Sequence, residues 1–469
     1  MDVGLTRDWV KTLGATVALA AMACTPGQEG EQNDASAGNT SDDVPTMATS
    51  VTGDPTPNPT TDQSSAEGTT GGTTDQATTE DPDSSDDGFI FDVNETPDGG
   101  GGGCGGGEVG DLSFSYIWIA NSGEGTISKI DTQTLDEVGR FLVSPNPNGL
   151  PSRTSVNLSG DVAVANRTGG ITKVYADQGD CQESNGMAGI QTSTGASDIL
   201  AWGTEECVAW HSPFAYGSQR PIAWTQGTFN PGTCSWQGQQ VWTTGTNVGG
   251  TADVILLNGD DGSIDDMVTI NGLTAFNDFG GYGAVVDTEG NLWFNEMHIF
   301  GDFLVRVDID DLSYDLIPTT GRSGYGIAID DEERIWTCGG GAVNRYDHGT
   351  GTWASYNLPL DLGGCMVDGE DRLWVSGSNA APFTFRAINT NSVTEVASFT
   401  IPEHVHGVSI DFEGNIWGVA GVPGVGAGTA AYRMDPTTGT YDTVTGLVDA
   451  YTYSDMTGFA LVGSTPPQG

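Results

Sequence analysis

The sequence Gly-Ala-Val-Val-Asp-Thr-Glu-Gly-Asn-Leu-Trp, residues 283–293, has three further copies in this chain. In each copy a Gly precedes a Trp by ten positions, and an Asp stands four positions after the Gly. The apolar run, the turn and the Leu-Trp run predict a strand, a tight turn and a second strand. Successive copies begin 43, 38 and 43 residues apart, a spacing typical of propeller blades. The repeated positions are Gly283, Gly326, Gly364 and Gly407, then Asp287, Asp330, Asp368 and Asp411, then Trp293, Trp336, Trp374 and Trp417.

The two ends of the repeat region complement each other. Residues 112–145 contain a Trp strand around Trp118 and an outer hairpin, but no preceding Gly strand. Residues 457–461 have the pattern of a first strand, with no Trp strand after it. We therefore predict that the C-terminal strand completes the first blade, which closes the ring and removes an open sheet edge.

The remaining units bring the predicted number of blades to seven. Blade two begins near Pro151, and an insertion at about 176–219 follows its inner strands. Blade three is irregular around Trp224 and Trp242. The prediction is an all-β fold over residues 112–469: a seven-bladed β-propeller of four-stranded antiparallel blades.

The N-terminal residues predict export. Residues 1–23 have the charged start and short apolar run of a signal peptide. Ala21-Met22-Ala23-Cys24 resembles a bacterial lipobox, in which the Cys24 thiol is acylated after cleavage. An ordinary secretory signal with a chance cysteine is the alternative. Thr25 gives no aspartate retention signal, so we expect a lipid anchor in the bacterial outer membrane, at the cell surface.

Residues 24–111 are rich in Thr, Ser, Asp and Gly and contain no Lys or Arg. Such a composition buries too little apolar surface to offset the entropy of ordering. We expect a disordered tether between the anchor and the propeller. The formal net charge of −48 argues against nucleic acid as a partner, because phosphate binding needs a basic patch. We expect a monomer that binds an unknown protein or small-molecule ligand.

An exported chain is expected to form disulfides. Cys181 and Cys207 flank the insertion and are predicted to pair. Cys338 and Cys365 lie on neighbouring blades and form a second candidate pair, whereas Cys104 and Cys234 are left unassigned.

A basic residue recurs in the outer hairpins, usually with an Asp two positions later. A structural role predicts that each cation pairs with a carboxylate of its own blade. A ring of anion-binding cations is the alternative. The basic positions are Lys129, Lys173, Arg306, Arg345 and Arg433.

These units resemble those of streptogramin (virginiamycin B) lyase propellers and are similar to NHL and lactonase-like propellers. The resemblance rests on the form His/Tyr-Gly-x-x-x-Asp-x-x-Gly-Asn-Leu-Trp-Phe-x-Glu followed by the basic hairpin. In the lyase family, one blade supplies a catalytic His just before its Gly and a Glu three after its Trp. The resemblance implies that Mg²⁺ polarises the substrate while the His removes a proton, so that a lactone ring opens by elimination.

The two catalytic positions are split between blades in this chain. His406 matches the His, but its blade has Ala420 in place of the Glu. Glu296 matches the Glu, but its blade has Tyr282 in place of the His. The resemblance therefore implies at most a degenerate lyase site with His406 and Glu296 as catalytic candidates and Mg²⁺ or Ca²⁺ as the cofactor.

In each blade, the position just before the repeated Gly and the position three after the repeated Trp are expected to face one mouth of the channel. They could form a ligand rim, or they could simply cap strands and face water. Asn258–Asp266 could hold Ca²⁺, or it could be an ordinary hairpin turn. We keep two functions: a ligand- or protein-binding module, and a metal-dependent lyase or lactonase. The expected rim residues are Tyr282, Tyr325, Asn121, Asn166, His406 and Glu296.

Overall fold

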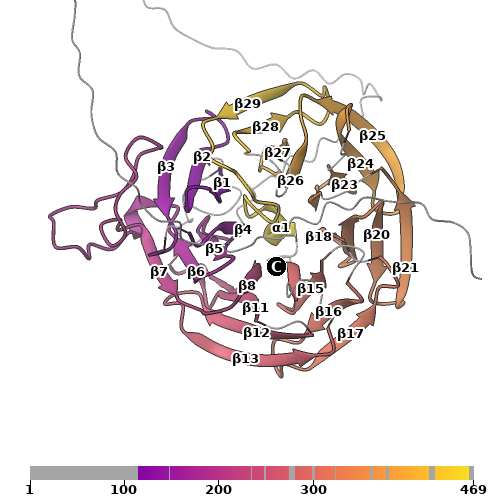
Figure 1. Ribbon diagram of the computed structural model, residues 1–469, viewed down its shortest axis with the longest axis horizontal. Coiled ribbons are helices and arrows are strands. Elements are labelled where there is room, and N and C mark those ends of the chain that lie inside the picture. Colours follow the sequence, from indigo (N-terminus) through magenta and orange to yellow (C-terminus); the bar gives the residue numbers. More distant parts are fainter. Residues whose placement is uncertain are drawn as a thin grey trace, which may run out of the picture. The chain divides into compact units, whose positions relative to one another are not determined.

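The computed structural model describes residues 115–463, apart from 147, 234, 248–249, 274–279, 298–300, 323, 360–362, 377–379 and 422–427. In this part, seven antiparallel sheets and one short hairpin are formed, and the sheets surround a central axis (Figure 1). This confirms the predicted seven-bladed β-propeller. The expectations for the signal peptide, Cys24 and the tether fall outside the described residues, as do Cys104 and Cys234.

The first three blades are the less regular ones. Blade one contains three strands: β1 (Tyr116–Asn121), β2 (Thr126–Asp131) and β3 (Glu137–Leu142). Blade two contains β4 (Pro151–Val156), β5 (Val162–Asn166), β6 (Gly170–Val174) and β7 (Val208–Ser212). Blade three contains β8 (Ser218–Trp224), β11 (Gln240–Thr246), β12 (Thr251–Asn258) and β13 (Ile264–Asn271), with the hairpin β9 (Thr228–Asn230) and β10 (Ser235–Gln237) inserted after β8.

The last four blades each have four strands in chain order. Blade four contains β14 (Gly281–Val286), β15 (Leu292–Glu296), β16 (Phe303–Val307) and β17 (Tyr314–Pro318). Blade five contains β18 (Gly326–Ile329), β19 (Ile335–Gly339), β20 (Ala342–Asp347) and β21 (Thr352–Asn357). Blade six contains β22 (Cys365–Val367), β23 (Arg372–Val375), β24 (Phe383–Asn389) and β25 (Thr394–Ile401). Blade seven contains β26 (Val405–Ile410), β27 (Ile416–Ala420), β28 (Ala430–Met434) and β29 (Tyr441–Thr445).

The repeated Asp and Trp fasten the two inner strands of a blade together. In blade seven, the buried Asp411 accepts hydrogen bonds from the Trp417 indole N–H and the Asn415 backbone N–H, both at 2.9 Å. Asp287, Asp330 and Asp368 bind their own Trp in the same way. The repeated Gly is required by close packing, because a Cβ at Gly407 would lie 2.0 Å from the Thr452 carbonyl oxygen.

The repeated cations are mainly structural. Arg306 lies opposite Trp293 in the sheet register and 3.6 Å from Asp308 of its own blade. Lys173 lies 3.1 Å from Asp161, also within its blade. These pairs confirm the predicted role for Arg306 and Lys173, whereas Lys129 and Arg345 donate to backbone carbonyls of the next blade. The cations also reach the next blade, since Arg433 donates to the Thr132 carbonyl of blade one.

The C-terminal segment closes the ring, although not as the predicted strand at 457–461. Ala450 pairs with Asn121 of β1, and the Trp118 N–H donates to the Met456 carbonyl at 2.8 Å. The chain then turns, because the Asp455 carboxylate accepts the backbone N–H groups of Thr457 and Gly458. Residues Phe459–Gly463 therefore form the short helix α1, at the centre of the ring (Figure 1).

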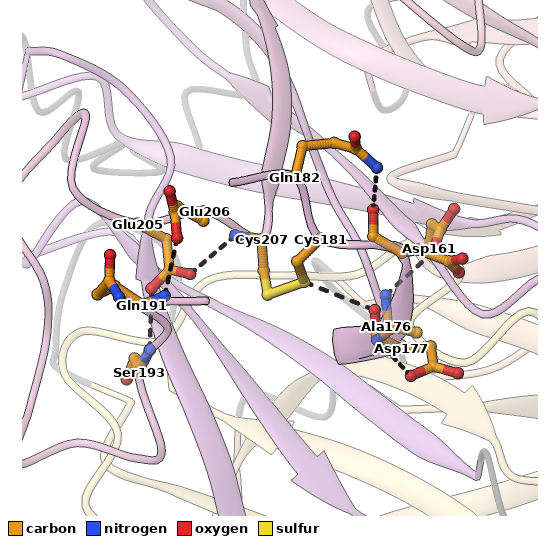
Figure 2. Close-up of a disulfide and its surroundings, with 12 residues drawn as sticks. Asp161, Ala176, Asp177, Cys181, Gln182, Gln191, Ser193, Glu205, Glu206 and Cys207 are labelled. Carbon is orange, nitrogen blue, oxygen red and sulfur yellow. Dashed lines mark hydrogen bonds between the residues drawn. A yellow bond between two sulfur atoms is a disulfide. The ribbon is translucent and has the colours of Figure 1, made fainter. Parts of the chain in front are cut away.

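The insertion in blade two is shorter than the predicted 176–219, because residues 208–212 form strand β7. The loop between β6 and β7 projects outward from the ring (Figure 1) and includes the single turn of 3₁₀-helix η2 (Gln178–Asp180). The predicted disulfide joins Cys181 and Cys207 at the base of this loop (Figure 2). A second disulfide joins Cys338 to Cys365 across blades five and six.

Beside the Cys181–Cys207 disulfide, the Glu206 carboxylate accepts the backbone N–H groups of Ser184, Asn185 and Gln191. These hydrogen bonds lower the pKa of Glu206.

Among the described helices, none has the length and apolar character needed to cross a bilayer.

Candidate ligand site in the central channel

Four tyrosines cluster in the channel, where the inner strands begin. Tyr282 and Tyr325 precede the repeated Gly of blades four and five, and their ring centroids are 5.0 Å apart. Tyr451 and Tyr453 come from the C-terminal segment; the Tyr325 and Tyr453 rings are 4.6 Å apart. All except Tyr451 are almost fully buried. The structure thus brings together two of the expected rim residues and adds two that the sequence did not suggest.

The hydroxyl groups of this cluster converge on Tyr451. The Tyr325 hydroxyl is hydrogen-bonded to the Tyr451 hydroxyl, and the Tyr282 hydroxyl lies 3.4 Å from it. Burial opposes ionisation of Tyr451, but the positive charges of Arg220 and Arg167 and these hydrogen bonds outweigh burial and lower its pKa to about 8. Burial raises the pKa of Tyr282 and Tyr325, so both hydroxyl groups keep their protons near pH 7.

Arg153 lies at the centre of the tyrosine cluster. Its guanidinium carbon is 3.2 Å from the centroid of the Tyr453 ring and 4.9 Å from that of Tyr282. Only 1% of the residue is exposed, and its Nε and Nη2 atoms have no hydrogen-bond partner in the protein. Arg167 is less buried and stacks 4.3 Å from the Tyr451 ring centroid.

Arg153 and Arg167 differ from most arginines of this acidic chain, because neither forms an ion pair with a carboxylate in the described part. Six others do so: Arg140, Arg306, Arg334, Arg372, Arg386 and Arg433. Positive charge is therefore concentrated in the channel without a neutralising partner for these two groups.

His406 lies beside the tyrosines. Its ring centroid is 4.9 Å from that of Tyr451, its Nδ1 is 3.1 Å from the Gly421 carbonyl oxygen, and its Nε2 has no partner. Burial, together with the neighbouring His404, lowers the pKa of His406 to about 3, so the imidazole is neutral near pH 7.

The other expected rim residues, Glu296, Asn121 and Asn166, form hydrogen bonds that hold the local backbone in place. The buried Glu296 carboxylate accepts the N–H groups of Asp302 and Phe303, both at 2.9 Å. Asn121 binds Thr126, Ser128 and the Val448 N–H. The Asn166 side chain donates to the carbonyls of Val143 and Gly170. These contacts are those of strand-capping residues.

The residues around His406 do not suit Mg²⁺, which prefers carboxylate and water oxygens. The contacts described for His406 are aromatic rings, a carbonyl and His404, together with the positive field of Arg153 and Arg167. Of the described residues, Asp330, Asp331 and Glu332 do lie close together, but Asp330 already binds Trp336 and Arg334. The Asn258–Asp266 stretch is a hairpin turn, with the Gly262 N–H donating to the Asn258 carbonyl.

A cavity of about 260 Å³ lies in the channel between Arg153 and α1. Its walls come from the inner strands β4, β8, β14, β18 and β22, and α1 covers it with Phe459, Leu461 and Val462. Tyr453, Ser454 and Asp455 also line it, and each has a buried polar side-chain atom without a partner. Burial raises the pKa of Asp455 to about 6.

Fold and site together define a seven-bladed β-propeller with an arginine- and tyrosine-lined channel. Its fold is similar to a streptogramin B lyase structure, with 15% identity, a TM-score of 0.45 and coverage of 67% of this chain and 92% of the other. A functionally unknown protein from Desulfotomaculum acetoxidans (10% identity, TM-score 0.48, coverage 72% and 98%) is also similar. So is Citrobacter koseri AztD (11% identity, TM-score 0.44, coverage 72% and 96%). No family model and no curated protein matches the chain.

The sequence did not point to Arg153, Tyr451 or Tyr453. Arg153 occupies the place of the repeated Gly in blade two, pairing with Ala165 just as Gly283 pairs with Asn295. A basic residue in a position that is glycine in blades four to seven was a usable signal. Nothing in the repeat predicts the two tyrosines, because they belong to the irregular closing segment.

Proposed function

We propose that this protein is an exported lipoprotein whose propeller binds a small-molecule ligand in its central channel. One observation carries the proposal: Tyr282, Tyr325, His406 and the closing tyrosines converge around Arg153, whose buried Nε and Nη2 groups have no hydrogen-bond partner in the protein. Binding sites typically combine apolar and aromatic walls with a few convergent polar groups.

The binding proposal is tested by screening acetate, octanoate, inorganic phosphate and glucose for an increase in melting temperature. We expect at least one of these compounds to raise the melting temperature of the wild type. Tyr325→Phe or His406→Gln should lower the affinity for that compound at least tenfold. Arg386→Gln, on the outer strand pair β24–β25, is the matched control and should leave binding unchanged. Equal binding to wild type and channel variants would place the ligand elsewhere and overturn the proposal.

The anchoring part of the proposal rests on Cys24 and on the two disulfides, which are typical of an oxidising compartment. Mass spectrometry of the mature protein should find an acylated N-terminal Cys24 in the outer-membrane fraction. The Cys24→Ser variant should lose both the acyl mass and the membrane association. A mature N-terminus at another residue would contradict the anchor.

A further inference from the structure

We propose that the channel ligand is an amphipathic carboxylate, with its head group on Arg153 and its apolar part in the cavity beneath α1. This inference rests on the proposed binding function and specifies the chemistry of the ligand. It starts from the position of Arg153, which belongs both to the tyrosine cluster and to the wall of the cavity.

The guanidinium group of Arg153 is held in place but is not satisfied. Stacking on Tyr453 and a 3.4 Å hydrogen bond from Nη1 to the Tyr453 carbonyl fix its plane. Nε and Nη2 remain without acceptors, although the group is almost fully buried. A buried cation is normally paired, and the planar fork of N–H donors matches the two oxygens of a carboxylate. An anion is therefore the missing partner that this geometry favours.

The walls of the cavity select the rest of the ligand. They are mainly apolar, and the cavity of about 260 Å³ exceeds the roughly 150 Å³ of an engineered apolar cavity that binds benzene. A free inorganic anion would leave this apolar volume unused. A chain or ring attached to the carboxylate would fill it and gain burial energy. The wall side chains include Ile222, Trp224, Val286, Ile329, Met366 and Leu461.

Four acidic residues line the cavity, Asp330, Asp331, Asp368 and Asp455, of which Asp331 is exposed to water. Asp330 and Asp368 lie at the far ends of their strands and are paired with Arg334 and Arg372 at 2.8 and 2.7 Å. The Oδ1 atom of Asp455 accepts two backbone N–H groups, and its Oδ2 atom is buried without a partner. Below its pKa of about 6, Asp455 is protonated and can donate a hydrogen bond to the carboxylate, whereas at higher pH its negative charge weakens binding of the ligand.

The test is calorimetric titration of the full mature chain with butanoate, hexanoate and octanoate, and with 1-octanol as the neutral counterpart. We expect each added methylene to lower Kd roughly fourfold, and octanol to bind at least tenfold more weakly than octanoate. Equal binding of octanol and octanoate would overturn the carboxylate assignment while leaving channel binding intact. The absence of any chain-length effect would overturn the cavity assignment.

Variants then locate the two parts of the ligand. Arg153→Gln should lower the affinity for octanoate at least tenfold without changing the affinity for octanol. Ala284→Leu should lower both affinities, because the larger side chain on the cavity wall would occupy part of the cavity. Arg386→Gln is the matched control, because this arginine pairs with Glu395 on the outer strands. If Arg153→Gln does not fold, the chain-length series and the octanol comparison on the wild type still decide the proposal.

Discussion

At the scale of single residues, the buried carboxylates of the repeat do structural work. Asp411 is fully buried and binds an indole N–H and turn amides at the same time. Loss of such a group leaves several buried donors without an acceptor, and each unsatisfied donor costs about 1–3 kcal/mol. The spacing of Asp and Trp in the sequence was therefore a stability signal rather than a catalytic one.

We expect Asp411→Ala to lower the free energy of unfolding by roughly 2–4 kcal/mol, because it orphans the Trp417 N–H and the turn amides. Urea denaturation followed by tryptophan fluorescence measures this. Asp442→Ala, which removes a partly exposed partner of Arg433, is the control and should cost less than about 1 kcal/mol. Equal losses in the two variants would contradict the structural role of Asp411.

Asp455 gives a prediction about pH. Its pKa is raised by burial to about 6, so the folded state holds a proton that the unfolded state has already released between about pH 4 and 6. Asp455 therefore makes the protein lose stability as pH rises through this window. Asp455→Asn should remove the loss and gain about 3 kcal/mol relative to wild type at pH 7, but little at pH 4. A difference between the two proteins that does not vary with pH would rule out the raised pKa.

At the scale of elements, regular units were predictable and irregular ones were not. The period and the Gly–Asp–Trp pattern predicted β14, β15 and their counterparts because these strands repeat the same local chemistry. The closing segment has no such pattern, since its conformation depends on distant contacts such as that between Trp118 and Met456. The alternating residues at 457–461 suggested a strand, but Phe459 and Leu461 bury their side chains from a helix.

In the candidate site, too, residues of the regular units could be predicted and residues of the closing segment could not. Tyr282, Tyr325 and His406 could be predicted because they share one place in the repeat. Glu296 shares a repeated place as well, but its hydrogen bonds to backbone N–H groups depend on the loop that follows β15. Arg153 and Tyr453 meet only through ring closure, which the local sequence does not encode.

The loop of blade two should depend on its disulfide more than the propeller does. We expect the double variant Cys181→Ser/Cys207→Ser to speed amide hydrogen exchange over residues 182–206. The disulfide joins residues that are 26 positions apart, and the loop between them has more conformational freedom once the disulfide is removed. The exchange of β14–β17 should not change. Cys338→Ser/Cys365→Ser is the matched control, since it removes a disulfide between blades. Faster exchange in blade four of the first variant would show that the loop supports the ring itself.

At the scale of the whole molecule, stability depends on closure. Blade one has three strands, and its inner edge is covered by the C-terminal segment. An uncovered edge exposes unpaired backbone groups and invites association between chains.

We expect a chain ending at Asp449 to lose its cooperative melting transition and to aggregate. A synthetic peptide of residues 450–463 added in trans should restore a cooperative transition, because the closing contacts are non-covalent. Calorimetry measures both results. A truncated chain that melts cooperatively on its own would show that the ring closes without this segment.

The central claim is that the C-terminal segment both closes the propeller and places its tyrosines in the channel. Amide hydrogen exchange of Trp118 and Tyr451 tests this most directly, because these N–H groups donate to Met456 and Ala120 across the closure. The account predicts that both amides exchange as slowly as those of the inner strands β14 and β26. Exchange of the Tyr451 amide at the rate of an unfolded chain would contradict it.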